Sequence, residues 1–264
     1  MKLAIAGSSG KMGRMVIEAA LAADDVTIAA ALERPDAPQI GEDCALFLGR
    51  TSGVAITSNI AALANADVLI DFTRPEGTLR HLAACVEHRV RAVIGTTGFD
   101  EAGRRQIEQA ARSVPVVFSP NMSVGVNVSF RLAELAARLL SGDFDVEIIE
   151  AHHRQKVDAP SGTALRLGEL VASALGRPLQ EVAVHSRHGL TGARSPGSIG
   201  FSVVRGGDMV GEHTVLFIGD GERVEITHRA SSRMTYALGS LRAARFLAQR
   251  APGLYDMRDV LGLG

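Results

Sequence analysis

Apolar residues in the first half of the chain form short runs that are separated by stretches of helical spacing. The runs are typical of buried parallel strands and comprise Lys2–Ala6, Val26–Leu32, Val68–Phe72, Ala92–Ile94 and Val116–Phe118. Between them, apolar positions recur with the period of a helix, which predicts helices over about 12–21, 76–88 and 101–112. This alternation predicts an α/β domain built on a doubly wound parallel sheet.

The pattern changes after Ser123. A helix over about 128–140 precedes a strand over Phe144–Glu150, and helical spacing resumes from Thr163. Further apolar stretches, separated by glycine-rich turns, predict a meander of strands over Ser198–Val204, Val210–Ile218 and Glu222–Ala230.

A last helical pattern covers Met234–Leu247 and is expected to pack back on the first half of the chain. Two domains follow from this order of elements. The first covers 1–123 and is completed by 234–264, whereas the second, over 124–233, is an α+β domain on a mixed open sheet. The second sheet has enough apolar positions for one packed face and for a contact between subunits.

A glycine-rich turn joins the first strand to the first helix. It reads Gly7-Ser-Ser-Gly-Lys-Met-Gly13, and in this context the glycines allow a tight turn and close approach of the backbone to a pyrophosphate. The turn therefore predicts a Rossmann-like, dinucleotide-binding domain. Its spacing differs from the commoner G-x-G-x-x-G, and a glycine turn without a ligand is the alternative.

An acidic and a basic residue end the second strand. Glu33 lies about 20 positions beyond Gly13, where a carboxylate can accept hydrogen bonds from the adenosine ribose. Arg34 follows it and can pair with a 2′-phosphate. The two residues predict use of NADH or NADPH, and Glu33 carries more of that prediction.

Three loops follow the ends of later strands, where ligands bind in parallel sheets. They are Asp71–Arg74, Gly95–Gly98 and Ser119–Ser123. Each loop alone is explained equally well as a turn or a helix cap. Their joint placement favours a nicotinamide pocket.

Composition narrows the classes of partner. The chain has 264 residues, and Lys+Arg 28 against Asp+Glu 29 gives a net charge of −1, so no global field recruits nucleic acid or a membrane surface. Its apolar runs are too short for a membrane helix or a signal peptide, so we expect a cytoplasmic protein. Cys44 and Cys85 lack ligand spacing, which argues against a zinc site or a disulfide framework.

The segment Glu150–Ala164 gathers titratable side chains at a strand-to-helix junction, and reads Glu-Ala-His-His-Arg-Gln-Lys-Val-Asp-Ala-Pro-Ser-Gly-Thr-Ala. Ser161 is expected to cap the helix, so that the backbone N–H groups of Gly162 and Thr163 point at an anion. Cations around the same anion would be His152, His153, Arg154 and Lys156. A solvated basic loop is the alternative, and the preceding dinucleotide domain favours a substrate site.

These motifs resemble those of the 4-hydroxy-tetrahydrodipicolinate (dihydrodipicolinate) reductase family, which acts in the diaminopimelate and lysine pathway of bacteria and plants. The resemblance covers nearly the whole chain and rests on Glu150–Ala164, Gly7–Gly13, Gly95–Gly98, Pro120–Asn127 and Gly211–His213. The chain has Gln155 where the family often has histidine, and Ser119 where it often has alanine. Neither departure removes a group with an implied role, so we expect effects on affinity at most.

The resemblance implies roles for single residues. His152 takes the position of the proton donor or acceptor, and Lys156 that of the general acid. His153 and the backbone at Gly162 and Thr163 take the positions that hold the substrate carboxylates. The implied cofactor residues, for NADH or NADPH, are Gly7, Ser8, Ser9, Gly10, Lys11, Met12, Glu33, Arg34, Gly95, Thr96, Thr97, Ser119, Pro120, Asn121 and Met122. The resemblance implies no metal, and it implies a homotetramer formed through the second-domain sheet.

The implied reaction reduces a small cyclic dicarboxylate. Its conjugated imine, formed by loss of water from 4-hydroxy-tetrahydrodipicolinate, accepts hydride at C4, and protonation of the resulting enamine gives tetrahydrodipicolinate. Lys156 would stabilise the developing negative charge, and neighbouring positive groups are expected to ease release of its proton. Substrate and cofactor residues lie in different domains, which predicts hinge closure near Ser123 and Arg233.

Two other functions remain open from the residues. One is another two-domain NAD(P)-dependent dehydrogenase of an amino-acid semialdehyde, whose thiol-ester chemistry would need Cys44 or Cys85 beside a histidine. The other is a nicotinamide-sensing regulator, which would have no use for a proton-handling histidine, a lysine and an anion-binding helix start together. The histidines outside the motif, including His81, His213 and His228, are expected to be structural or solvated.

Overall fold

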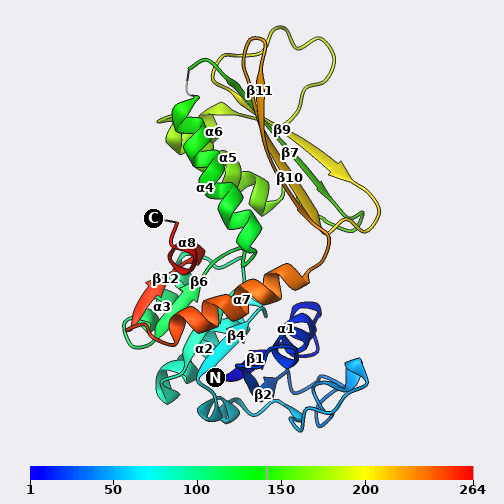
Figure 1. The fold of residues 1–264 in the computed structure, drawn as a ribbon, viewed down its shortest axis with the longest axis vertical. Helices are drawn as coiled ribbons and strands as arrows, with labels where there is room; N and C mark the ends of the chain where they lie inside the picture. The colour runs from blue at the N-terminus through cyan, green and yellow to red at the C-terminus, as the bar shows by residue number, and fades with distance from the viewer. Residues whose placement is uncertain (141, 264) are drawn as a thin grey trace. The chain divides into compact units, whose positions relative to one another are not determined.

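The structure, a computed structural model, describes residues 1–140 and 142–263. The chain divides into two compact units, Met1–Val124 with Arg233–Gly264 and Gly125–Ser232 (Figure 1). The boundaries expected from the sequence were 123/124 and 233/234. Each unit has its own sheet, with an apolar cluster on either face of the first sheet and one apolar cluster in the second unit.

The first unit is built on a seven-stranded sheet in the order β12-β6-β5-β4-β1-β2-β3, in which the described pairings are parallel. Its strands are β1 (Lys2–Ala6), β2 (Thr27–Leu32), β3 (Ile56–Thr57), β4 (Val68–Asp71), β5 (Arg91–Ile94), β6 (Pro115–Phe118) and β12 (Gly253–Tyr255). Because the strands are parallel, the loops that follow β1, β2, β4, β5 and β6 gather at one edge of the sheet.

Helices cover both faces of this sheet. Alternate residues of β1 point to different cores: Leu3 and Ile5 pack with α1 (Lys11–Leu21) and α7 (Met234–Leu247), whereas Ala4 and Ala6 pack with α2 (Pro75–His88) and α3 (Glu101–Ala111). The shorter elements are η1 (Leu46–Leu48), η2 (Ile60–Asn65) and α8 (Met257–Leu261). This arrangement confirms the predicted doubly wound, Rossmann-like fold.

The second unit has a mixed five-stranded sheet in the order β11-β10-β7-β9-β8. Its strands are β7 (Asp145–His152), β8 (Ala183–Val184), β9 (Ile199–Arg205), β10 (Gly211–Ile218) and β11 (Arg223–Ala230). The mixed sheet was expected, but a meander through its last three strands was wrong. Only β10 and β11 form a hairpin, because β9 pairs in parallel with β7, and β7 separates it from β10.

One face of the second sheet packs on helices and the other is uncovered in the described chain. In Figure 1, α4 (Val124–Leu139), α5 (Gly162–Ala174) and α6 (Leu179–Val182) lie on the same side of the sheet. Side chains of β7 and β10 alternate accordingly, with Ile148, Val215 and Phe217 in the core. The helix α4 begins earlier than the expected residue 128.

Candidate active site

The glycine loop after β1 has the geometry of an anion-binding turn. Gly7 has a φ of +66°, and its carbonyl accepts a hydrogen bond from the Gly10 N–H at 2.9 Å. A Cβ at Gly13 would lie 2.1 Å from the Gly7 oxygen, so only glycine lets α1 pack this closely on the loop. The Ser8 and Ser9 hydroxyl oxygens are buried without a partner among the described residues. Unused polar groups beside a helix start fit a pyrophosphate.

Glu33 lies beside this loop, directly after β2. Its carboxylate accepts hydrogen bonds from the backbone N–H groups of Ser9 at 3.1 Å and Arg34 at 2.9 Å. The Arg34 guanidinium lies 3.5 Å from the carboxylate of Asp36, and both side chains are exposed. Because an exposed ion pair is weak, Arg34 can exchange this partner for a phosphate. Lys11 is exposed at the first position of α1.

A buried carboxylate ties together the loops after β4 and β5. Asp71 accepts hydrogen bonds from the Thr73 N–H and hydroxyl at 2.8 and 2.6 Å and from the Thr78 hydroxyl at 3.1 Å, and it lies 2.8 Å from Nδ1 of His81. The Thr78 hydroxyl also lies 2.8 Å from that of Thr96. Burial raises the pKa of Asp71, but His81 and the threonine donors outweigh burial, and the pKa is lowered. The Thr96 side chain is therefore anchored in the fold, which leaves its backbone for a ligand.

Close packing explains why the residue before Thr96 is a glycine. A Cβ at Gly95 would lie 2.1 Å from the ring of Phe72 in the neighbouring loop. Only a glycine lets these two loops approach so closely. The exposed Thr97 follows Thr96 at the same edge of the sheet.

The loop after β6 is held by its own polar groups. The Ser119 hydroxyl donates to the Asn121 carbonyl at 2.9 Å, and the Asn121 side-chain oxygen accepts from the Ser123 N–H at 2.9 Å. Pro120 is exposed, whereas Met122 is 1% exposed and lies in the first core. The expected contact of Met122 with a cofactor can therefore involve only its backbone.

In the second unit, β7 carries the histidines of the basic motif to the edge of the sheet. The strand runs to His152, two residues beyond the predicted end at Glu150. The loop after β9 closes over this end, since the Gly206 N–H donates to the His152 carbonyl at 3.0 Å and the His153 N–H donates to the Met209 carbonyl at 2.9 Å. The backbone of His152 and His153 is therefore fixed on both sides.

The helix start has the predicted form. Ser161 is the N-cap of α5, and its hydroxyl oxygen accepts a hydrogen bond from the Ala164 N–H at 3.2 Å. Gly162 and Thr163 form the first turn, at the positive end of the helix dipole. The exposed Gly162 has no atom near the position of a Cβ, so the approach to this turn is open.

Lys156 lies in the loop between β7 and α5. Its Nζ donates to the Asp158 carboxylate at 2.8 Å, and its backbone N–H donates to the His153 carbonyl at 3.1 Å. The partner of the ammonium is thus an anion, whereas the sequence led us to expect cations around it. Arg154 is exposed on the same loop.

Sequence reasoning gave no role to Glu150, which the structure places at the centre of the site. Its side chain is 1% exposed. One carboxylate oxygen lies 2.7 Å from Nδ1 of His152, and the other accepts a hydrogen bond from the Ser161 N–H at 2.9 Å. The Arg205 guanidinium donates to both oxygens, each at 2.7 Å. Residues i and i+2 of a strand share a face, so the pairing of Glu150 with His152 follows from a strand that runs to His152, whereas the predicted strand ended at Glu150.

The electrostatics of these groups favour an ionised Glu150 and a neutral His152. Burial raises the pKa of Glu150, but Arg205, His152 and the Ser161 N–H outweigh it, and the pKa is lowered. Burial is the largest cause that lowers the pKa of His152, and the charges of Lys156 and Arg205 lower it further, against the effect of Glu150.

His213 is the third residue that sequence reasoning left outside the site. It pairs in register with Glu150 across the sheet, its Nε2 lies 2.9 Å from the Ser161 hydroxyl, and its ring packs edge-on to His152 at 5.0 Å. Burial lowers its pKa to about 3. His213 is therefore a neutral buried support of the cap, as a structural histidine would be. Neither Arg205 nor His213 could be placed here without the strand register.

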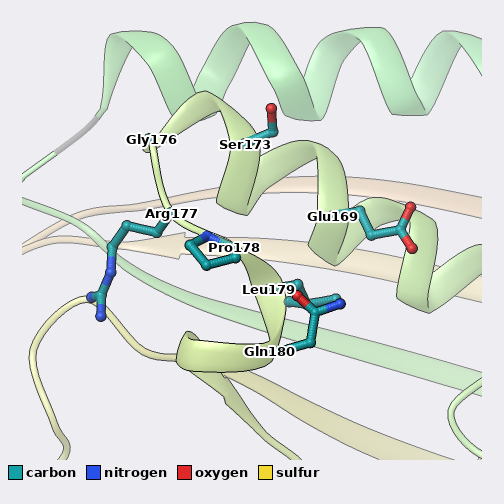
Figure 2. A pocket seen from close by; sticks show the side chains of 7 residues that line it. All are labelled: Glu169, Ser173, Gly176, Arg177, Pro178, Leu179 and Gln180. Atoms are coloured by element: carbon teal, nitrogen blue, oxygen red, sulfur yellow. The ribbon is translucent and has the colours of Figure 1, made fainter.

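The second unit also has a hollow of about 460 Å³, which lies away from the Glu150–Ala164 segment (Figure 2). It is found where α5 ends and α6 begins, and it is lined by Glu169, Ser173, Gly176, Arg177, Pro178, Leu179 and Gln180. The basic motif precedes and enters the opposite, N-terminal end of α5. The hollow contains none of the residues expected to bind substrate.

Other chemistries find little support in the described part of the chain. Burial raises the pKa of both Cys44 and Cys85, so neither thiol is suited to nucleophilic attack. Among residues 1–140 and 142–263, no group of three or more histidine, cysteine or acidic side chains is placed to hold a metal ion. The same residues include no helix that is long and apolar enough to cross a membrane.

Comparisons with known proteins cover the whole chain. The family profile "Dihydrodipicolinate reductase, N-terminus" matches residues 1–122, and "Dihydrodipicolinate reductase, C-terminus" matches residues 125–261. A 4-hydroxy-tetrahydrodipicolinate reductase of Herminiimonas arsenicoxydans is 62% identical over 264 residues, which are 100% of this chain and 98% of the relative. One from Cupriavidus necator is 61% identical, over 100% of both chains.

A solved structure agrees with these relatives. The dipicolinate-bound dihydrodipicolinate reductase from Paenisporosarcina sp. TG-14 is 26% identical, covers 98% of each chain and superposes with a TM-score of 0.77. The relatives match this chain over its full length, and the two family profiles match both units. The dinucleotide loop of the first unit and the basic strand-to-helix junction of the second fit a reductase of this kind. The chain belongs to the dihydrodipicolinate reductase family.

Proposed function

We infer that the chain reduces 4-hydroxy-tetrahydrodipicolinate, by way of dihydrodipicolinate, to tetrahydrodipicolinate in diaminopimelate and lysine biosynthesis. The observation that carries this inference is the Glu150–Ala164 junction, where a buried histidine, a lysine and an open helix start occur in one segment. Relatives with 61–62% identity over the full chain carry the name of this reductase. A sensor without catalysis would not need these groups together.

The first unit supplies the residues for the cofactor. Bound NADH or NADPH would provide the hydride. Gly7 through Met12 would hold its pyrophosphate on the start of α1, and Glu33 would face the adenosine ribose. Arg34 would pair with a 2′-phosphate, which supports use of both cofactors. The backbones of Gly95–Thr97 and Ser119–Met122 would line the nicotinamide.

The second unit supplies the proton and holds the substrate. One hydride and one proton are added across the double bond conjugated to the imine. Lys156 would give the proton as general acid and would neutralise the charge that develops on the ring. His152 would exchange a proton through Nε2, for which no hydrogen bond is found among the described residues.

Two anion-binding groups suit a dicarboxylate. The N–H groups of Gly162 and Thr163 would bind one carboxylate at the positive end of α5, and His153 would contribute beside them. The relative from Paenisporosarcina sp. TG-14 is described as dipicolinate-bound. That ligand carries two carboxylates, which supports a small dicarboxylate substrate for this chain.

The test follows NAD(P)H oxidation with freshly condensed pyruvate and aspartate semialdehyde. We expect the His152→Ala and Lys156→Ala variants to lose about 100-fold or more in kcat, because each removes a proton-transfer group. Their affinity for NADH should stay near that of the wild type, since the cofactor residues lie in the first unit. A matched control is His188→Ala, an exposed histidine of the second unit. Near-normal turnover in the first two variants would contradict the assigned roles.

Three further properties belong to the proposal. The uncovered face of the second sheet supports assembly into a homotetramer.

The chain passes between its units near Ser123 and Arg233, and hinge motion there would close the enzyme on its ligands. A biosynthetic reaction fed by NAD(P)H, with both cysteines buried and unpaired, supports action in the cytoplasm.

A further inference from the structure

Glu150 contacts two functional parts of the site. Its carboxylate holds Nδ1 of His152 on one side and the backbone N–H of Ser161, the cap of α5, on the other. The proton-handling imidazole and the anion-binding helix start are therefore held by one charged group. The imidazole belongs to β7 and the helix start to α5, and a loop separates these two elements in the chain.

The ionised carboxylate decides which nitrogen of His152 carries the proton. A carboxylate only accepts hydrogen bonds, so the nitrogen 2.7 Å away must donate. Nδ1 therefore bears hydrogen in the neutral ring, and Nε2 keeps its lone pair. The bidentate contact with Arg205, at 2.7 Å to each oxygen, keeps Glu150 ionised and fixes its plane.

The surroundings of Nε2 leave that nitrogen room to act. A Cβ at Gly211 would lie 3.0 Å from Nε2, so the glycine of β10 prevents crowding there. The ring also packs edge-on to His213, with the ring centroids 5.0 Å apart, which restricts its rotation. The ring thus has one orientation, with Nδ1 on Glu150 and Nε2 away from it.

We propose that Glu150 is the positioning residue of this enzyme, which fixes His152 in the Nδ1–H form and presents Nε2 as the nitrogen that exchanges a proton with substrate. The proposal rests on the catalytic role proposed for His152. Replacement of Glu150 by glutamine keeps its size. Arg205 donates to both oxygens and loses one contact whichever way the amide turns, but the Ser161 N–H can only donate, so the amide N–H₂ turns toward Nδ1. Nδ1 then becomes an acceptor, and the hydrogen moves to Nε2.

The experiment combines nitrogen NMR with kinetics on the full-length protein. In protein labelled with ¹⁵N-histidine, the His152 signals are identified by their loss in His152→Gln. We expect hydrogen on Nδ1 in the wild type and on Nε2 in Glu150→Gln, with kcat at least about 100-fold lower in the variant and an unchanged KM for NADH. A matched control is Glu169→Gln on α5, whose exposed carboxylate pairs with Arg166 at 2.8 Å.

The outcomes separate this proposal from the proposed function. An unchanged tautomer in Glu150→Gln, or turnover that survives the change of tautomer, overturns the positioning role. If the variant fails to fold, the wild-type spectrum decides, because hydrogen on Nε2 of neutral His152 contradicts the proposal. Full activity of His152→Ala instead refutes the proposed role of His152.

Discussion

His213 shows how a buried residue can tie the stability of the site to pH. Burial is the main cause that lowers its pKa to about 3. The titratable groups that act on it are Glu150 and His152 on β7, Lys156 on the following loop and His228 on β11. Protonation would place a positive charge on a buried ring beside Ser161, the cap of α5, where burial disfavours the charge more than Glu150 stabilises it.

We therefore predict that His213 makes the protein less stable in acid. An unfolded histidine titrates near pH 6.5 and the folded His213 near 3, so between these values the unfolded chain binds more protons and stability falls as the pH falls. The His213 contribution to the free energy of unfolding should drop by about 2 kcal/mol from pH 7 to pH 5. Urea unfolding of His213→Gln, at fixed protein concentration, should lack this part of the pH dependence.

The exposed histidine His188 offers the control for this measurement. His188→Gln should keep the pH dependence of the wild type, because the substitution is at an exposed position and leaves the buried His213 and its surroundings unchanged. An identical slope in His213→Gln and the wild type would show that His213 titrates normally in the folded protein. Carboxylates shared by all three proteins cancel in the comparison.

Single residues were predictable where their role is local. Ser161 was recognised as a cap because capping depends on a few neighbouring residues. Arg205 lies just beyond the predicted strand Ser198–Val204 and received no role, since its contact with Glu150 depends on the parallel register of β7 and β9, which the sequence does not specify. Met122 looked like a ligand contact but is buried, because the side chain that follows a strand can point into the core.

Elements were predictable to the extent that their pattern is periodic. β1 and α7 have the predicted bounds, Lys2–Ala6 and Met234–Leu247, because their apolar spacing is regular. The order of β9 and β10 was mispredicted, since strand pairing joins residues far apart in sequence. The short strands β3, β8 and β12 have too few residues to show a period.

The Asp71 network joins two of these elements, and we predict that it supports the cofactor loops. Asp71→Asn keeps the size of the side chain but removes the charge opposite His81 and weakens the threonine contacts. Stability should fall by about 3 kcal/mol, the usual effect of breaking a buried pair. We expect the dissociation constant for NADH to rise by about 10-fold, measured by fluorescence titration, because the loops after β4 and β5 lose their shared anchor.

A matched substitution lies at the other end of the same strand. Asp67→Asn changes an exposed carboxylate that precedes β4 and accepts from the Lys2 N–H at 2.7 Å. NADH affinity should be unaffected there, because the cofactor loops follow the strand ends. Equal NADH affinity in Asp71→Asn and the wild type would show that the network serves stability alone.

At the scale of the whole molecule, one face of the second sheet is not covered by any other part of the described chain. Helices pack on one side, while Ile149, Val204 and Ile218 on the other side are 37%, 47% and 36% exposed. Ion pairs such as Glu212–Arg229 lie among them. An antiparallel hairpin can face water on one side, but apolar side chains on neighbouring strands favour burial by another copy of the chain.

We predict that a charge at the centre of this face separates the subunits. Ile149→Lys should fold, since the side chain is already partly exposed, but the lysine would have to be buried unpaired in the assembled protein. Light scattering during gel filtration should give about four times 27.8 kDa for the wild type and a smaller mass for the variant. Leu46→Lys, at a 56% exposed position of the first unit, should keep the wild-type mass. A tetramer that survives Ile149→Lys would place the subunit contact on another surface.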